Sequence, residues 1–268
     1  MNSLSKLTNV DKILCVGWVA YAGCALLHSR STSQDAWAAP RFGVAAAPYV
    51  TAALAPTAAA VARAYFPTGV WASQHSNLAA WPYLEACLYN ASYVRPDAWV
   101  PSAPLARSVR RLLAPAPLDL ALLEADQDAA AAQVAGALAA LRRGRAAFDT
   151  PHGFAALEGL LNATADGLAV LRSAHLATFS AQAVVACCAA PGPPGGRCAG
   201  ATAGFLPGDA AALLQSAQAH VGALRAAAAR GLPWPVRAAD IGVVVASVTT
   251  RIASIDPACY QDATTPPF

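Results

Sequence analysis

The sequence predicts an all-α protein with an N-terminal apolar helix, which we expect to be a membrane helix, and an antiparallel helical bundle rich in alanine and leucine. Hydrophobic residues make up 56% of the chain and charged residues only 12%, against about 25% charged in ordinary soluble domains. Much of the excess is alanine, the best helix former. Past Pro101, apolar residues recur at helical spacing between prolines and glycines. We divide the chain into an apolar helix (1–30), a proline- and aromatic-rich irregular segment with short helices (31–101), the bundle (102–257) and a tail (258–268).

An uncharged run from Ile13 to Leu27 dominates the first segment. As a helix, this run covers about 22 Å of a hydrocarbon core about 30 Å thick. Lys6 and Lys12 precede it, as in a signal peptide or a signal anchor. Ala36 and Ala38 lie too far beyond the run for a well-placed cleavage site. We therefore favour a retained membrane anchor, with a cleaved signal and a buried core helix as the alternatives.

Small residues define one face of this predicted helix. Gly17, Ala20 and Cys24 stand at positions i, i+3 and i+7, so they share a face that allows close contact with a neighbouring helix. We expect residues 13–27 to contact the lipid bilayer and the chain to bind protein subunits of a membrane complex. The expected location is a membrane, with an organellar one such as the mitochondrial inner membrane as the specific prediction and an extracytoplasmic or secreted location as the alternative.

Prolines and aromatic residues characterise the second segment, so its helices are expected to be short. The apolar stretch over 43–66 resembles a second span in composition, but Pro48, Pro56 and Arg63 argue against one. We interpret the aromatic residues as a packing seam, with an aromatic belt at a membrane interface as the alternative. These residues are Trp37, Trp71, Trp81, Trp99, Tyr49, Tyr65, Tyr83, Tyr89 and Tyr93.

The bundle is predicted from four long helical patterns that follow a short helix over 107–113. The first begins at Pro117, a favoured first-turn residue, and the second at Thr150 and Pro151. The second ends near Ala190, before the glycines and prolines of PGPPGG. Their predicted buried residues are Val134, Leu138 and Leu141 in the first helix, and Leu157, Leu161, Leu168, Leu171, His175 and Phe179 in the second.

The third pattern begins at Asp209, a capping residue, and ends at Gly231. The fourth follows Pro235 and ends at Asp256, before Pro257. The predicted buried residues are Leu214, Ala217, Val221 and Leu224 in the third helix, and Ile241, Val245, Val248, Ile252 and Ile255 in the fourth. Short or proline-rich links between such helices are typical of an antiparallel bundle.

Five cysteines lie outside the first helix and no two of the seven form a CxxC pair. Cys187 or Cys188 could bond Cys198, and Cys87 could bond Cys259, if the compartment is oxidising. Free buried thiols are the alternative. Asn90 and Asn162 fit the glycosylation pattern, although so short a pattern often arises by chance.

Composition excludes several classes of function. The net charge of +3 is too small and too evenly spread for a nucleic-acid footprint. Lys6 and Lys12 are the only lysines, whereas ATP sites of the Walker and kinase types and Schiff-base enzymes need a lysine within the fold. Three glutamates are too few for a di-iron bundle. The five histidines form no sequence cluster, and we expect His175 to be a hydrogen-bonded core residue.

No catalytic, metal-ligating or cofactor-binding residues emerge from the sequence. We therefore expect a non-catalytic, membrane-anchored accessory or structural subunit of a larger membrane assembly, which contacts its partners through the bundle and the aromatic segment and needs no cofactor. A secreted or cell-surface helical binding domain stabilised by disulfides is one alternative. A carrier of a pigment or another small molecule is the other.

Overall fold

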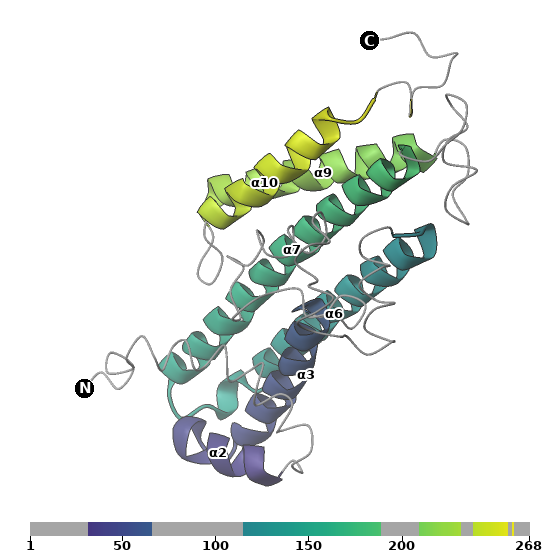
Figure 1. Cartoon of the computed structure of the whole chain (residues 1–268). Helices are drawn as coiled ribbons and strands as arrows, with labels where there is room; N and C mark the ends of the chain where they lie inside the picture. The colour runs from purple at the N-terminus through teal and green to yellow at the C-terminus, as the bar shows by residue number, and fades with distance from the viewer. Residues whose placement is uncertain (1–31, 66–114, 189–208, 232–237, 257–258, 260–268) are drawn as a thin grey trace, which may run out of the picture. The chain divides into compact units, whose positions relative to one another are not determined.

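The computed structural model describes residues 32–65, 115–188, 209–231, 238–256 and 259. Regular structure within these ranges is helical, which confirms the all-α bundle (Figure 1). The helices are α2 (Thr32–Phe42), α3 (Ala47–Tyr65), α6 (Pro117–Arg143), the 3-10 helix η5 (Arg145–Ala147), α7 (Pro151–Cys188), α9 (Asp209–Arg230) and α10 (Ala238–Ala253). The apolar run over 13–27 and the short helix over 107–113 lie outside the described residues.

The helices group into two compact units, and the boundary falls inside α6 and inside α7. Of the described residues, unit 1 contains α2, α3, α6 from Asp126 onward and α7 up to Ala169. Unit 2 contains the start of α6, α7 from Val170 onward, α9 and α10. This grouping joins residues 32–65 to residues 126–169, whereas the sequence pattern placed them in separate segments.

Side-chain caps fix where α6 and α7 begin. The backbone N–H of Ala116 donates to Oδ2 of Asp119 at 3.0 Å, which is the backward half of a capping box. The backbone N–H of Gly153 donates to Oγ1 of Thr150 at 3.1 Å, the bond of an N-cap threonine. Both starts agree with the positions predicted from Pro117 and Thr150.

Helix α3 is longer than the short helices predicted for this part of the chain. It runs for 19 residues and contains Pro56, which lacks the N–H that would bond the carbonyl of Ala52. Alanine-rich sequence favours the helix, and a buried stripe at helical spacing adds packing that offsets the missing bond. The stripe consists of Ala47, Val50, Ala53, Thr57, Ala60 and Ala64.

The predicted buried stripes of the bundle are largely confirmed. The predicted residues of α6, α7 and α9 are all buried. Of the stripe predicted for the fourth helix, Ile241 and Val248 in α10 are buried, as is Ile255 just past the end of α10 at Ala253. Val245 and Ile252 are half-buried. Val244 is a buried residue that the predicted stripe left out.

Helix α7 is long and apolar enough to cross a membrane, judged by length and composition within the described residues. Core helices of soluble proteins have the same properties. Its 38 residues span about 57 Å, about twice a hydrocarbon core. In unit 1, Glu158 of α7 accepts a bond from Arg142 at 2.7 Å, and in unit 2 the apolar side chains of α7 are buried beside α9 and α10 (Figure 1). The half of α7 from Val170 onward is mostly buried in unit 2, whereas the half up to Ala169 is mostly exposed or half-buried.

In unit 1 the link between α2 and α3 packs against the link between α6 and α7. The backbone N–H of Asp149 donates to the carbonyl oxygen of Phe42 at 3.1 Å. Gly43 has φ +106°, and the carboxylate of Asp149 occupies the space that a Cβ would need there. A glycine is thus required at this corner for both backbone conformation and space.

Candidate functional site

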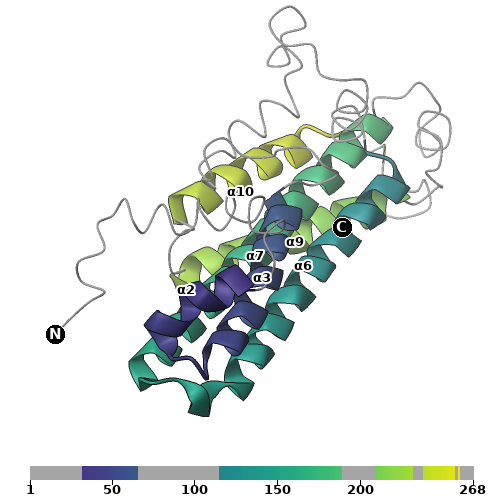
Figure 2. The same ribbon diagram turned by 90° about the horizontal axis from the view of Figure 1, so that it is seen from below.

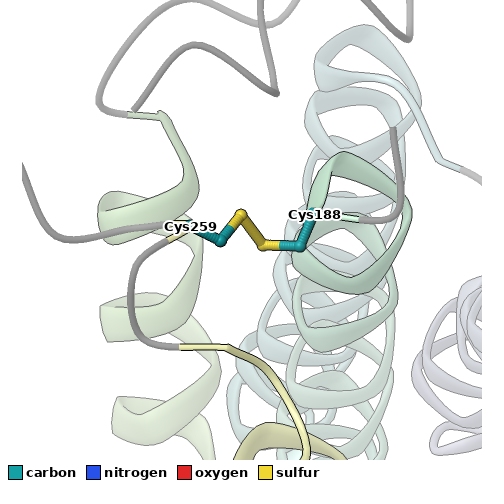
Figure 3. Close-up of a disulfide and its surroundings, with 2 residues drawn as sticks. All are labelled: Cys188 and Cys259. Carbon is teal, nitrogen blue, oxygen red and sulfur yellow. A yellow bond between two sulfur atoms is a disulfide. The ribbon is translucent and has the colours of Figure 1, made fainter. Parts of the chain in front are cut away.

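A disulfide closes one end of unit 2. Cys188, the last residue of α7, is bonded to Cys259 beyond the end of α10 (Figure 3). The two Cα atoms are 5.6 Å apart and the residues are separated by 71 positions in the sequence. The apolar core beneath this bond contains Val184, Leu214 and Ile255. The cross-link therefore holds the end of α7 to the segment that follows α10.

This pairing corrects the sequence prediction. Cys87 was named as a possible partner of Cys259, and Cys188 as one of two possible partners of Cys198. Cys188 and Cys259 instead bond each other. The reason is tertiary: α7 and α10 pack together in unit 2, so their C-terminal ends meet. Cys187 is also disulfide-bonded, and it is buried against Ala183 and Ala210. Cys87 and Cys198 lie outside the described residues.

His175 lies in the core of unit 2. Its side chain is fully buried, and its ring lies 5.9 Å from that of Phe179 between centroids. Burial lowers the pKa of His175 from 6.5 to about 3, because the charged imidazolium loses its hydration. The imidazole is consequently neutral at physiological pH, and a proton-transfer role there would require a group that titrates near that pH. The predicted buried position is confirmed.

A polar cluster joins three helices of unit 2. Nη2 of Arg172 on α7 donates to Oε1 of Glu124 on α6 at 3.0 Å. His220 on α9 is half-buried. Burial is the main cause of its lowered pKa, the positive charge of Arg172 lowers the pKa further, and the negative charge of Glu124 raises it. The Arg172 and Glu124 side chains are 28% and 54% exposed, and partly exposed ion pairs of this kind add little stability. Sequence reasoning missed this cluster because Glu124 and Arg172 stand 48 positions apart.

Unit 1 presents a different feature, an aromatic corner at the outside of α2. The ring of Phe148 contacts those of both Phe42 and Phe154, with centroid distances of 6.0 Å and 5.4 Å. Trp37 joins them through Phe42, at 5.9 Å. The guanidinium of Arg41 lies over the Trp37 ring, 4.8 Å from its centroid, in a cation–π contact. Trp37, one of the aromatic residues interpreted as a packing seam, contacts this corner through Phe42 and remains exposed.

The other predicted site residues divide into two groups. Asn162 is exposed on α7, and the hydroxyl of Thr164 in the same glycosylation pattern donates to the carbonyl of Leu160 at 2.9 Å. Gly17, Ala20, Cys24 and Asn90 lie outside the described residues. Among the side chains that the structure describes, no three His, Cys, Asp or Glu residues gather to hold a metal ion.

The fold and these contacts define a disulfide-linked, all-α helical bundle. Comparison with models of known protein families, with curated proteins and with solved structures found no match.

Proposed function

We propose that this protein is a non-catalytic, membrane-anchored accessory subunit of a larger membrane assembly, with its helical bundle on the oxidising side of the membrane. The observation that carries the proposal is the Cys188–Cys259 disulfide in a chain that also contains the uncharged run over 13–27. Disulfides persist in oxidising compartments such as the periplasm, the secretory pathway and the cell surface. A 15-residue apolar run preceded by lysines is a signal for membrane insertion.

The disulfide also supports an orientation that the basic residues leave open. Lys6 and Lys12 precede the run, and Arg30 and Arg41 follow it, so the two flanks carry equal numbers of basic residues and the positive-inside rule does not choose between them. Cys188 and Cys259 both follow the run and must reach an oxidising compartment to bond. We therefore place the N-terminus on the reducing side and the bundle on the other.

Apolar side chains left exposed on the bundle supply surfaces for partner subunits. Leu118 and Leu122 on α6 are 68% and 48% exposed, and their i, i+4 spacing places them on one face of the helix. Exposed apolar side chains that share one face of a helix are typical of protein–protein contact sites. We assign the partner contacts of the bundle in unit 2 to this face of α6.

The proposal is tested on the full chain in membranes of its source. We expect the protein to stay in the pellet after alkaline carbonate washing and, after mild detergent extraction, to migrate with other subunits on a native gel. Leu118→Glu with Leu122→Glu should release the protein from that assembly while leaving it in the membrane. Exposed Val243→Glu on α10 is the matched control and should not release it. Recovery of the unmodified chain as a monomer from the soluble fraction would overturn the proposal.

The disulfide equally favours a second candidate, a secreted or cell-surface helical binding domain. This candidate requires the apolar run to be a cleaved signal, and it allows a glycan on exposed Asn162. Intact mass before and after reduction separates the two. A mass that includes residues 1–30 supports the anchored subunit, whereas a shortened chain carrying hexose units supports the secreted domain.

A further inference from the structure

We infer that the outward face of α2 lies in the phospholipid headgroup layer beside the membrane anchor. The inference rests on the proposed function, because it takes residues 13–27 as a retained anchor. It assigns a lipid surface as the partner of an apolar and cationic face that is exposed in unit 1. The surface is defined by the exposed residues of one side of α2, namely Ala36, Trp37, Pro40 and Arg41, and we call it the α2 face.

The side chains of the α2 face match the chemistry of a bilayer interface. Trp37 is 43% exposed. The guanidinium of Arg41 lies over the Trp37 ring, and its Nη1 donates to the backbone carbonyl of Trp37 at 2.9 Å. Tryptophan is enriched at membrane interfaces, where its ring sits at the headgroup level. Arginine buries its stem along apolar surface while its guanidinium reaches polar surroundings. Val44, just beyond α2, is 81% exposed and extends the apolar character of the corner.

The single acid of α2 does not lie on this face. Asp35 accepts a hydrogen bond at 2.6 Å from the hydroxyl of Thr51 on α3, and α2 and α3 pack side by side in unit 1 (Figure 2). Buried Ala38 lies on the same inner side. The ionised group that α2 presents outward is therefore Arg41, which lipid phosphates attract.

The length of chain before α2 keeps this face close to the bilayer. Leu27 and Thr32 are five positions apart, so an extended link reaches at most about 18 Å. Trp37 lies five residues further, a rise of about 7 Å along α2. As a helix, the apolar run would cover about 22 Å of a core about 30 Å thick, so an inserted run would draw the residues that follow it toward the interface. The link and the helix rise together keep Trp37 within about 25 Å of the end of the run, a distance that allows it to reach the headgroups.

The test uses the full chain, labelled with fluorotryptophan and inserted into phosphatidylcholine nanodiscs. Trp37→Phe assigns the Trp37 fluorine resonance, and Trp234→Phe, a substitution outside α2, is the matched control that leaves it in place. Phosphatidylcholine spin-labelled on its headgroup should broaden the Trp37 resonance. Phosphatidylcholine spin-labelled on its acyl chain should broaden that of Trp18, which lies in the apolar run.

The two labels separate failure of the inference from failure of the proposed function. Broadening of Trp18 by the acyl-chain label, with no loss of Trp37 intensity in the headgroup-labelled nanodisc, would overturn the inference and leave the anchor intact. No broadening of either resonance would overturn both. Loss of both resonances, each with its own label, supports the α2 face as a lipid contact.

Discussion

Removing the Cys188–Cys259 disulfide should destabilise unit 2. The change is the double substitution of both cysteines by alanine, which leaves neither thiol free to attack the disulfide of neighbouring Cys187. The bond closes a loop of 71 positions. By the chain-entropy relation this restricts the unfolded chain by about 15 cal/mol/K, or about 4.4 kcal/mol at 25 °C.

Urea unfolding of the detergent-solubilised protein, followed by far-ultraviolet circular dichroism, measures this loss. Asn162→Ala, an exposed change on α7, is the control and should leave the midpoint unchanged. Amide exchange should localise the loss to α10, because the bond holds the segment that follows it. If the double substitution lowers the unfolding free energy by less than about 1 kcal/mol, the disulfide does not supply the stability calculated for it.

Three further predictions concern buried and strained positions. Burial lowers the pKa of His175 from 6.5 to about 3, so between these pH values the unfolded chain binds a proton that the folded chain excludes. The unfolding free energy should therefore be highest above pH 6.5 and should fall toward pH 3 by up to about 1.4 kcal/mol per pH unit. In His175→Leu, the unfolding free energy measured by urea titration should no longer fall with pH by this amount. An unchanged pH dependence would contradict the burial of a neutral His175. Gly43→Ala should cost more than about 1 kcal/mol, because φ is +106° and a Cβ has no space. Gly136→Ala, at a helical position of α6 with open space for a Cβ, should raise the unfolding free energy by about 0.5–1 kcal/mol. Thermal unfolding that found Gly43→Ala more stable than Gly136→Ala would refute this. Leu161→Ala, in the core, should cost about 2–5 kcal/mol. Exposed Leu118→Ala should cost less than about 0.5 kcal/mol by the same measurement, so equal losses would contradict the burial of Leu161.

The helices of the bundle were predictable from sequence because their boundaries are set by local chemistry. Thr150 caps α7 with its own hydroxyl, and Gly231 ends α9 with φ +67°, which glycine adopts without a Cβ penalty. The buried stripes were equally predictable, since spacing alone places apolar side chains on one face.

The contacts between distant segments were not predictable in the same way. Pro56 normally argues against a long helix, and α3 forms because neighbouring helices bury its alanines. Cys259 bonds Cys188 because the ends of α7 and α10 meet, and no spacing in the sequence encodes that meeting. Glu124 and Arg172 pair for the same tertiary reason.

The adjacent cysteines at the end of α7 also constrain how the protein matures. Cys187 and Cys188 are both oxidised, and successive helical positions point about 100° apart, so each thiol faces a different partner. If Cys187 and Cys188 each bond the other's partner, correct pairing requires the two disulfides to exchange partners. This exchange needs a thiolate to attack an existing disulfide. We expect correct pairing to depend on a compartment that supplies thiol–disulfide exchange as well as oxidation. Production in such a compartment should therefore yield one disulfide isomer, and rapid oxidation without a thiol catalyst should yield a mixture.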